Sequence, residues 1–209
     1  MMIASFAGKN SSLVESLNYV ANGDSITQYG EVPYPTTVFN AFVDTTDKYL
    51  TNVAAAGRSS TILLSGLQVY LTANYRPGYT NILSIMVGVN DIATDVPNAT
   101  IISNILASVV IGVANDFTVY IFTTTPFKVG GESLAQYDID YANTLLVNED
   151  IRVNASSSGY TVIDIANTEK YNYQDCVYDI DIYLDGVHMT YSGYAYIGNY
   201  AYDIISQTI

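Results

Sequence analysis

Residues 17–27 read LNYVANGDSIT, an apolar run that stops at a glycine and continues into a polar turn. The part from Leu17 to Asn22 carries β-branched and aromatic residues and is bounded by Asn and Gly, which is typical of a buried strand. A serine, Ser25, stands in the turn that follows. The segment therefore predicts a strand that passes at once into a helix.

The same alternation of strand and helix continues to the end of the chain. Further strand candidates are Tyr49–Ala54, Asn81–Val87, Thr118–Thr123 and Tyr160–Ile165. Helical spacing is found after Tyr34-Pro35, around residues 62–71 and 101–110, in Leu134–Ile151 and in Tyr191–Ile205. Such alternation implies βαβ crossovers and a sheet covered on both faces. We expect the α/β class: a flavodoxin-like, three-layer α/β/α sandwich with a mainly parallel central sheet.

The length and composition indicate one folded domain. The chain has 209 residues, of which 49% are hydrophobic and 13% charged, so a packed core is available and disorder is not expected. Residues 17–209 are predicted to form the domain, and residues 1–16 an N-terminal extension without an assigned role. The start has neither a charged region nor a long apolar one, so no signal peptide is expected.

The charge balance excludes several partners. Seven Lys and Arg against twenty Asp and Glu give a formal net charge of −13, which leaves too few bases for binding nucleic acid or an anionic membrane surface. No apolar run is long enough for a membrane span. Twenty Tyr and no Trp suggest a virion or extracellular surface protein, although the sequence leaves the location and the oligomeric state open.

Metal sites and disulfides are not expected. Cys176 and His188 are the only residues of their types, which excludes an intrachain disulfide, a Cys-based zinc site and a multi-His site. Three acids, Asp175, Asp179 and Asp181, offer the carboxylate oxygens that Ca²⁺ prefers, so a Ca²⁺ site is one interpretation of this stretch. The preferred interpretation is a solvated acidic loop, so the sequence predicts no metal and no cofactor.

Polar residues follow three of the predicted strands, at the sheet edge where α/β proteins gather function. Ser25 has a nucleophile's place in a strand-to-helix turn, with an ordinary helix cap as the alternative. Gly57 can offer a backbone N–H to a ligand, or it is a turn glycine. Asn90 can donate its side-chain amide to an oxyanion, or it forms an Asx turn.

The fourth candidate group lies before the last predicted helix, where the chain reads Asp185-Gly186-Val187-His188. A carboxylate three residues before a histidine can hold Nδ1 of the imidazole while Nε2 faces a nucleophile. A lone histidine is more often structural. That alternative is weakened here by the Asp-x-x-His spacing.

These four segments, in this order, resemble the SGNH (GDSL-type) hydrolases from about Leu17 to the C-terminus. The matching stretches are residues 23–27, 52–57, 88–91 and 185–188, with Tyr34-Pro35 as the usual continuation of the first. The resemblance implies Ser25 as nucleophile, His188 as general base and acid, and Asp185 as its orienting partner. It also implies an oxyanion hole made by the N–H groups of Ser25 and Gly57 and by the Asn90 side chain.

Two features near these stretches need separate expectations. Asp24 and Asp91 match the family pattern and are expected to fix the loops. Arg58 departs from it, because many members carry smaller residues there. We expect Arg58 to pair structurally with Asp24 or Asp91, with contact to an acidic substrate as the alternative.

The predicted function is a serine esterase that hydrolyses esters of short acyl groups, acetyl above all. Seven tyrosines lie near Asp185 and His188 in the sequence, and aromatic rings with a hydroxyl suit sugar binding, so O-deacetylation of a carbohydrate is the preferred reaction. These are Tyr171, Tyr173, Tyr178, Tyr183, Tyr191, Tyr194 and Tyr196. Core or interface packing of these rings is the competing interpretation. The alternatives in function are an esterase for longer, lipid-type acyl chains and a carbohydrate-binding adhesin domain that has lost turnover. A nucleotide binder is disfavoured, because the chain lacks a Gly-rich phosphate loop.

Overall fold

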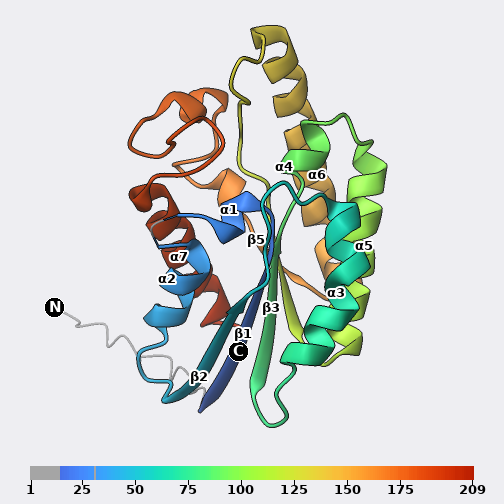
Figure 1. The fold of residues 1–209 in the computed structure, drawn as a ribbon, viewed down its shortest axis with the longest axis vertical. Helices are drawn as coiled ribbons and strands as arrows, with labels where there is room; N and C mark the ends of the chain where they lie inside the picture. Colours follow the sequence, from blue (N-terminus) through green and yellow to red (C-terminus); the bar gives the residue numbers. More distant parts are fainter. Residues whose placement is uncertain (1–14, 31) are drawn as a thin grey trace, which may run out of the picture.

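The computed structural model describes residues 15–30 and 32–209, which build one five-stranded sheet (Figure 1). The strand order is β2-β1-β3-β4-β5, and every neighbouring pair is parallel. The strands are β1 (Ser16–Gly23), β2 (Asp47–Asn52), β3 (Thr80–Met86), β4 (Thr118–Phe122) and β5 (Thr161–Ile163). The predicted parallel sheet is confirmed.

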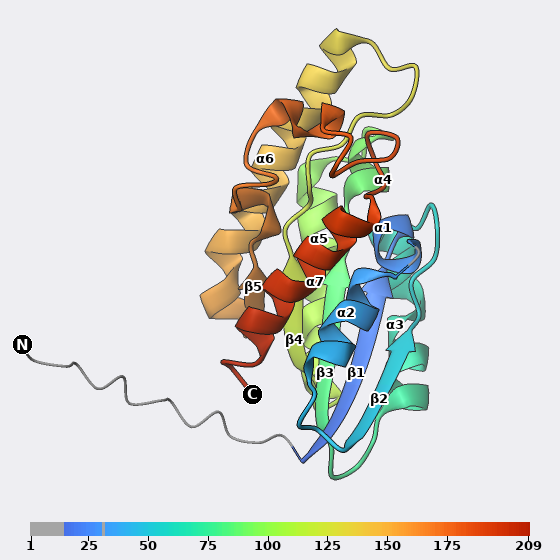
Figure 2. The ribbon, with the colours of Figure 1, turned by 90° about the vertical axis from the view of Figure 1, so that its left-hand side faces the viewer.

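Helices cover both faces of the sheet, as Figures 1 and 2 show. On one face lie α2 (Tyr34–Ala41) and α7 (Tyr191–Ile205), which pack against each other. On the other lie α3 (Ser60–Asn74), α5 (Asn98–Ala114) and α6 (Leu134–Ser158). The three-layer α/β/α architecture is therefore confirmed. None of the helices in the described part of the chain is long and apolar enough to cross a membrane.

Short helical elements lie in the connections of the fold; a helix directly after β1 was predicted, and the other short elements were not. They are the one-turn helices α1 (Ser25–Gln28) and α4 (Val89–Ile92), and the 3-10 turns η1 (Ile165–Asn167) and η2 (Gln174–Tyr178). Each is too short to show an apolar period, because a single turn presents no repeat of 3.6 residues.

Several predicted boundaries were wrong by a few residues. The second strand was expected over Tyr49–Ala54, but it begins at Asp47 and ends at Asn52, whose side chain accepts the N–H of Ala54 and bends the chain. The helix expected to end at Ile151 runs to Ser158, where Gly159 terminates it in the left-handed region with φ 76°. A glycine adopts this conformation without a Cβ penalty.

The core lies around the central strands β1 and β3. Leu17, Val20, Leu83 and Ile85 are fully buried, since each strand is covered by a helical layer on both faces. The hydroxyl of Tyr19 is within 2.9 Å of Ser84 Oγ across this pair of strands. A polar group buried there is thus hydrogen-bonded, as the low polarity of a core requires.

The expected N-terminal extension, residues 1–16, falls almost wholly outside the described residues. Its last residue, Ser16, already belongs to β1 and pairs with Asp47 of β2. The first residue of the sheet therefore lies one position before the predicted boundary at Leu17.

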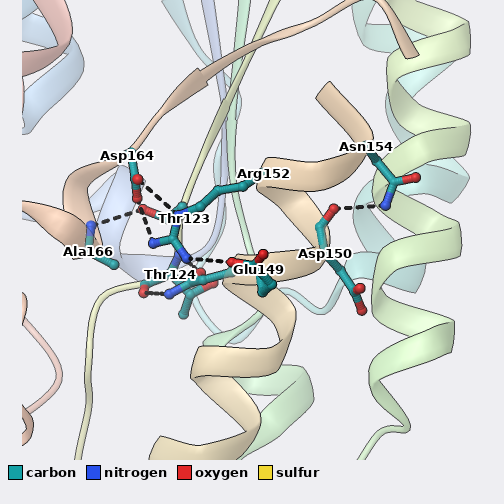
Figure 3. A network of polar contacts seen from close by, with 9 residues as sticks. Thr123, Thr124, Glu149, Asp150, Arg152, Asn154, Asp164 and Ala166 are labelled. Atoms are coloured by element: carbon teal, nitrogen blue, oxygen red, sulfur yellow. Dashed lines mark hydrogen bonds and ion pairs between the residues drawn. The ribbon is translucent and has the colours of Figure 1, made fainter. Parts of the chain in front are cut away.

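A polar network holds the carboxyl end of β4 to its neighbours (Figure 3). Arg152 of α6 binds both carboxylate oxygens of Asp164, at 2.9 and 2.8 Å. One helical turn earlier, the side-chain amide of Asn148 accepts from Thr124 N at 2.7 Å and donates to Thr124 O at 2.8 Å. The segment that leaves β4 toward the sheet edge therefore starts from a fixed point.

Candidate active site

The tight passage from β1 into α1 positions Ser25. A Cβ on Gly23 would lie 2.3 Å from the carbonyl oxygen of Met86, so only glycine lets β1 approach β3 this closely. Asp24 then caps α1, because its Oδ1 accepts the N–H of Ile26 at 2.9 Å. Ser25 is the first residue of α1 and is 8% exposed. Its hydroxyl is presented at the carboxyl edge of a central strand.

Asp185 and His188 lie in the segment before α7 and reach the same serine. Nδ1 of His188 is 2.8 Å from Asp185 Oδ2, and Nε2 is 2.9 Å from Ser25 Oγ. Asp185 Oδ1 also accepts the backbone N–H groups of Val187 and His188, at 2.9 and 2.7 Å. The structure thus brings together three residues that the sequence analysis selected, with the imidazole between a hydroxyl and a carboxylate.

The charge state of Asp185 suits this position. Partial burial raises the pKa of its carboxyl, but the hydrogen bonds from His188 and from the Val187 N–H outweigh that effect and hold the pKa below its usual range. The carboxylate is therefore ionised at neutral pH. An ionised partner fixes the proton on Nδ1 of a neutral imidazole and leaves Nε2 free to accept one.

Two of the oxyanion candidates, Gly57 and Asn90, follow the two strands that flank β1. Gly57 follows β2 with φ 69°, and Asn90 belongs to α4 directly after β3. Within the described residues, no hydrogen bond uses the backbone N–H of Gly57 or that of Ser25. The Asn90 amide donates to the carbonyl of Arg58 at 3.2 Å, which occupies one of its two hydrogens. Unused donors thus remain in the segments that follow β2, β1 and β3.

Asp91 has the loop-fixing contacts that were expected of it. Its carboxylate accepts the N–H of Ser60 at 2.8 Å and the Ser60 hydroxyl at 2.7 Å, and Asp91 itself is fully buried. The bond joins the start of α3 to α4. It therefore holds the loops that carry Gly57 and Asn90 at a constant separation.

Asp24 is less completely satisfied. Its Oδ2 is buried without a hydrogen-bond partner in the described part of the chain, and the residue is 1% exposed. Burial raises the pKa of the Asp24 carboxyl to about 7, against the lowering effect of the Ile26 N–H and of His188. A protonated Asp24 still accepts the Ile26 N–H, so the cap survives in either charge state.

The expected partners of Arg58 were wrong. Its guanidinium is buried and donates from one nitrogen to Asn22 Oδ1 at 2.5 Å and to the Val53 carbonyl at 2.7 Å, not to Asp24 or Asp91. Asp91 is already occupied by Ser60, and the Arg58 side chain instead crosses from the end of β2 to the end of β1. Arg58 therefore has the structural role that the sequence analysis preferred, but its hydrogen-bond acceptors are neutral groups and not carboxylates.

The seven tyrosines near the site divide between core and surface. Tyr171, Tyr183 and Tyr194 are buried, as the packing interpretation expected, and Tyr196 is partly buried. Tyr173, Tyr178 and Tyr191 remain exposed on the segment around the site.

The acidic residues and the cysteine of this segment form no metal-binding cluster among the described residues. Across residues 15–30 and 32–209, no group of three or more His, Cys, Asp or Glu side chains is arranged to hold a metal ion. Cys176 is buried, and burial raises the pKa of its thiol to about 11, so it is an unreactive core residue.

Two supporting contacts were missed by the sequence analysis. The ring of Tyr29 meets His188 edge-on, with centroids 6.1 Å apart. Lys128 donates its backbone N–H to the carbonyl of Gly186 at 2.8 Å and so braces the loop of the catalytic candidates. Neither contact has a local signal, since the partners lie far apart in the sequence.

Comparison with known proteins places the chain in a family. A model of the GDSL-like lipase/acylhydrolase family matches residues 21–196. The chain belongs to this family. The match covers the whole sheet except the first residues of β1, and it includes Ser25, Gly57, Asn90, Asp185 and His188. Members of this hydrolase family are generally esterases or acylhydrolases.

Solved structures of the family share the fold. A member of the lipolytic G-D-S-L family from Veillonella parvula matches with a TM-score of 0.73 and 17% identity, over 92% of this chain and all of that one. A GDSL-like lipase from Bacteroides thetaiotaomicron gives 0.68 and 16%, over 92% and 89%. A variant of an acetyl xylan esterase from Geobacillus stearothermophilus gives 0.69 and 14%, over 92% and 96%. No curated protein matches the chain.

Proposed function

We propose that this protein is a serine ester hydrolase in which Ser25 is the nucleophile, His188 the general base and acid, and Asp185 its orienting partner. The observation that carries the proposal is the continuous chain of contacts from Ser25 Oγ to His188 Nε2 at 2.9 Å and from Nδ1 to Asp185 at 2.8 Å. Hydrogen-bond reach between nucleophile and base, with a third group orienting the base, is what nucleophilic catalysis requires.

The reaction proceeds in two acyl-transfer steps. Ser25 Oγ attacks the ester carbonyl while its proton passes to His188 Nε2, and the same proton then goes to the leaving alkoxide. Water, deprotonated by His188, attacks the acyl-enzyme, and the proton returns to Ser25 as the acid departs. Asp185 stays ionised throughout and stabilises the imidazolium that forms in each step.

The N–H groups of Ser25 and Gly57 and the second amide hydrogen of Asn90 are proposed to hold the negative oxygen of each tetrahedral intermediate. Their unused donors and their places directly after β1, β2 and β3, three neighbouring strands, support this assignment. Donors fixed before the reaction stabilise the developing charge without a reorganisation cost.

The proposed substrates carry short acyl groups, acetyl above all. Support comes from the sequence, in which no long apolar lid segment stands out. A carbohydrate as the alcohol is a second candidate, favoured by the exposed rings of Tyr173, Tyr178 and Tyr191, because aromatic faces stack on sugar rings.

The test compares p-nitrophenyl acetate with p-nitrophenyl octanoate, using wild type, Ser25→Ala and Ser65→Ala. Ser65 is an exposed serine of α3 and serves as the matched control. We expect turnover that prefers acetate, is lost in Ser25→Ala and is unchanged in Ser65→Ala. A preference for octanoate would show a lipid-type esterase. Equal rates in wild type and Ser25→Ala would overturn the mechanism and favour a binding domain without turnover.

A further inference from the structure

The one-turn helix that carries Ser25 also carries a glutamine that the mechanism above does not use. Gln28 is the last residue of α1, three positions after Ser25, and residues three apart lie on the same side of a helix. Its side-chain oxygen, Oε1, accepts the backbone N–H of Ala56 at 2.6 Å. Ala56 directly precedes Gly57, the proposed oxyanion donor that follows β2. One side chain thus joins the helix of the nucleophile to the neighbour of a proposed donor.

Gly57 lies at the corner of a type II β-turn over residues 55–58. The Arg58 N–H donates to the Ala55 carbonyl at 3.2 Å, which closes the turn. Gly57 is the third residue of this turn and has φ 69°, whereas Ala56, the second residue, does not have a positive φ. In a type I turn the third residue has a negative φ and the central peptide faces the opposite way. The direction of the Gly57 N–H therefore depends on a conformation that glycine adopts without a Cβ penalty.

The corner of this turn has a single tether. At the base of the turn, the Ala55 N–H donates to the Gly23 carbonyl at 3.1 Å and so joins the end of β2 to the end of β1. Ala56 and Gly57 themselves are exposed. In the described part of the chain, the bond to Gln28 is the only hydrogen bond that involves the backbone of either residue. The position of the corner therefore depends on Gln28.

The helix at the other end of the tether is itself held in place. Asp24 Oδ1 accepts the Ile26 N–H at 2.9 Å at the start of α1, and Asn52 Nδ2 donates to the Thr27 carbonyl at 2.9 Å near its end. Because Asn52 ends β2, α1 is joined to the end of β2 and to the turn after it. Figures 1 and 2 show α1 beside this segment at the carboxyl end of β1. Gln28 therefore acts from a fixed point.

We propose that Gln28 is a positioning residue for the oxyanion hole, and that its bond to Ala56 sets the separation of the Gly57 N–H from Ser25. The inference rests on the proposed function, because it takes Gly57 as an oxyanion donor. It goes further by assigning the side chain that places this donor. A donor stabilises the developing charge only within hydrogen-bond distance of the oxygen, so a small shift of the turn lowers the rate.

A positioning role and a purely structural role predict different measurements. The free energy of unfolding should depend little on this bond, because Gln28 and Ala56 are both exposed and water replaces a hydrogen bond lost at such a position. The effect should instead appear in the step in which charge develops on the substrate oxygen. An interaction made only in the transition state lowers kcat and leaves KM nearly unchanged.

The first test measures kcat and KM on p-nitrophenyl acetate for Gln28→Met, in which the side chain keeps nearly its length but loses its acceptor oxygen. We expect kcat to fall about tenfold, a part of the loss for a whole oxyanion donor, with KM changed less than about twofold. Gln68→Met is the matched control, since Gln68 is an exposed glutamine of α3 whose Oε1 accepts from Asn115 at 3.2 Å. An unchanged kcat, or a change in KM alone, would overturn the proposal.

The second test asks whether the direction of the Gly57 N–H matters. Gly57→Ala adds a Cβ that meets nothing within 4 Å, so its effect comes from the positive φ and favours the type I turn. We expect kcat to fall about 10²-fold. Gly78→Ala is the matched control, because Gly78 has φ 83°, its Cβ would also meet nothing within 4 Å, and it lies just before β3, at the other end of the sheet. Equal kcat in the two glycine variants would overturn the proposal.

The double variant Gln28→Met/Gly57→Ala tests whether Gln28 acts through this donor. Once the Gly57 N–H has turned away, its distance from Ser25 no longer matters. We therefore expect Gln28→Met to lower kcat less than about twofold in the Gly57→Ala background. A tenfold loss in both backgrounds would show that Gln28 acts independently of Gly57 and would overturn the proposal.

A third measurement does not need turnover. Amide NMR spectra of wild type, Gln28→Met and Gln68→Met follow the N–H signals of Ala56 and Gly57. We expect both signals to move in Gln28→Met only, because the Ala56 N–H loses its acceptor and the turn shifts. Unmoved signals would overturn the positioning role even if the esterase is active. Signals that move as expected in a protein without Ser25-dependent turnover would show that the tether holds the turn, and would overturn the proposed function instead.

Discussion

The two halves of the site are built in different ways. Ser25, Gly57 and Asn90 follow three adjacent strands within a few residues, and Ser25 is 8% exposed. Asp185 and His188 stand on the segment between β5 and α7, whose only regular elements are two 3-10 turns. Their side chains are 55% and 32% exposed. Ser25, Gly57 and Asn90, here called the strand half, are thus positioned by the sheet. Asp185 and His188, the loop half, are positioned by a small number of loop contacts.

The contacts that hold the loop half are few enough to name. Leu184 donates its N–H to the His188 carbonyl at 2.8 Å, Thr190 donates to Ile182 at 2.8 Å, and Gly186 accepts from Lys128. The strand half is held by continuous ladders of the parallel sheet. Substitutions in the strand half should therefore lower kcat with little change in the free energy of unfolding. Substitutions in the loop half should lower both.

The largest effect is expected at the imidazole that joins the two halves. His188→Ala removes both the base and the acid, and we expect kcat to fall by about 10⁴-fold or more. Asp185→Asn should cost less, because two backbone N–H groups still hold residue 185 in place. Initial rates on p-nitrophenyl acetate measure both. An Asp185→Asn loss as large as that of His188→Ala would contradict the ranking.

The next effect tests the strand half. Asn90→Ala removes one proposed oxyanion donor and should lower kcat by about 10²–10³-fold, with little change in the free energy of unfolding. Stability is unaffected because the amide makes only one bond, to the Arg58 carbonyl at 3.2 Å. An unchanged kcat would remove Asn90 from the oxyanion hole.

Substitutions of Arg58 test whether this side chain supports the strand half. The guanidinium holds Asn22 and Val53 together, and the Arg58 carbonyl accepts from Asn90. Arg58→Met leaves Asn22 Oδ1 without this donor, and we expect kcat to fall about tenfold at nearly constant KM. Arg58→Lys keeps one charged donor and should recover part of the loss. Equal losses of kcat in the two variants would show that a charged hydrogen-bond donor at position 58 does not support the site.

Gly186 tests the loop half. Gly186→Ala forces a Cβ onto a residue with φ 84° and to 2.8 Å from the Lys128 carbonyl oxygen, so we expect a loss of about 1–3 kcal/mol in unfolding free energy and a severalfold drop in activity. Gly130→Ala is the matched control, because Gly130 lies two residues after Lys128 and a Cβ there meets nothing within 4 Å. Urea denaturation compares the two. Equal stability of the two variants would contradict the loop's dependence on glycine.

The smallest effect on activity is expected at Asp24, where the pH dependence of stability is the readout. Because burial raises the pKa to about 7, the folded state keeps a proton that the unfolded chain loses at lower pH. Wild-type stability should therefore decline relative to Asp24→Asn as the pH rises from 5 to 8, by on the order of 2–4 kcal/mol. Asn retains the cap of α1. A stability difference that is the same at both pH values would show that Asp24 is ionised in the folded state throughout.

The strand half was readable from the sequence because its signals are local. The apolar run before Gly23, the glycine at 57 and the Gly88–Asp91 stretch each stand directly after a strand, and parallel strands bring their carboxyl ends to one edge. The helix Tyr191–Ile205 was predicted to the residue, since its apolar period is long and begins at a capping Thr190. Boundaries such as the end of β2 depended on a single side chain and were missed.

The sequence by itself determined the parallel α/β/α fold and the residue types of the site, because strand patterns, turn glycines and the Asp-x-x-His spacing act over a few residues. Only the tertiary structure decided the partners of Arg58, the bond from Ser60 to Asp91 and the bond from Lys128 to Gly186. Each of these joins segments far apart in the chain, and which donor meets which acceptor depends on packing. Contacts between segments that are far apart in the chain leave no local sequence pattern from which they could be predicted.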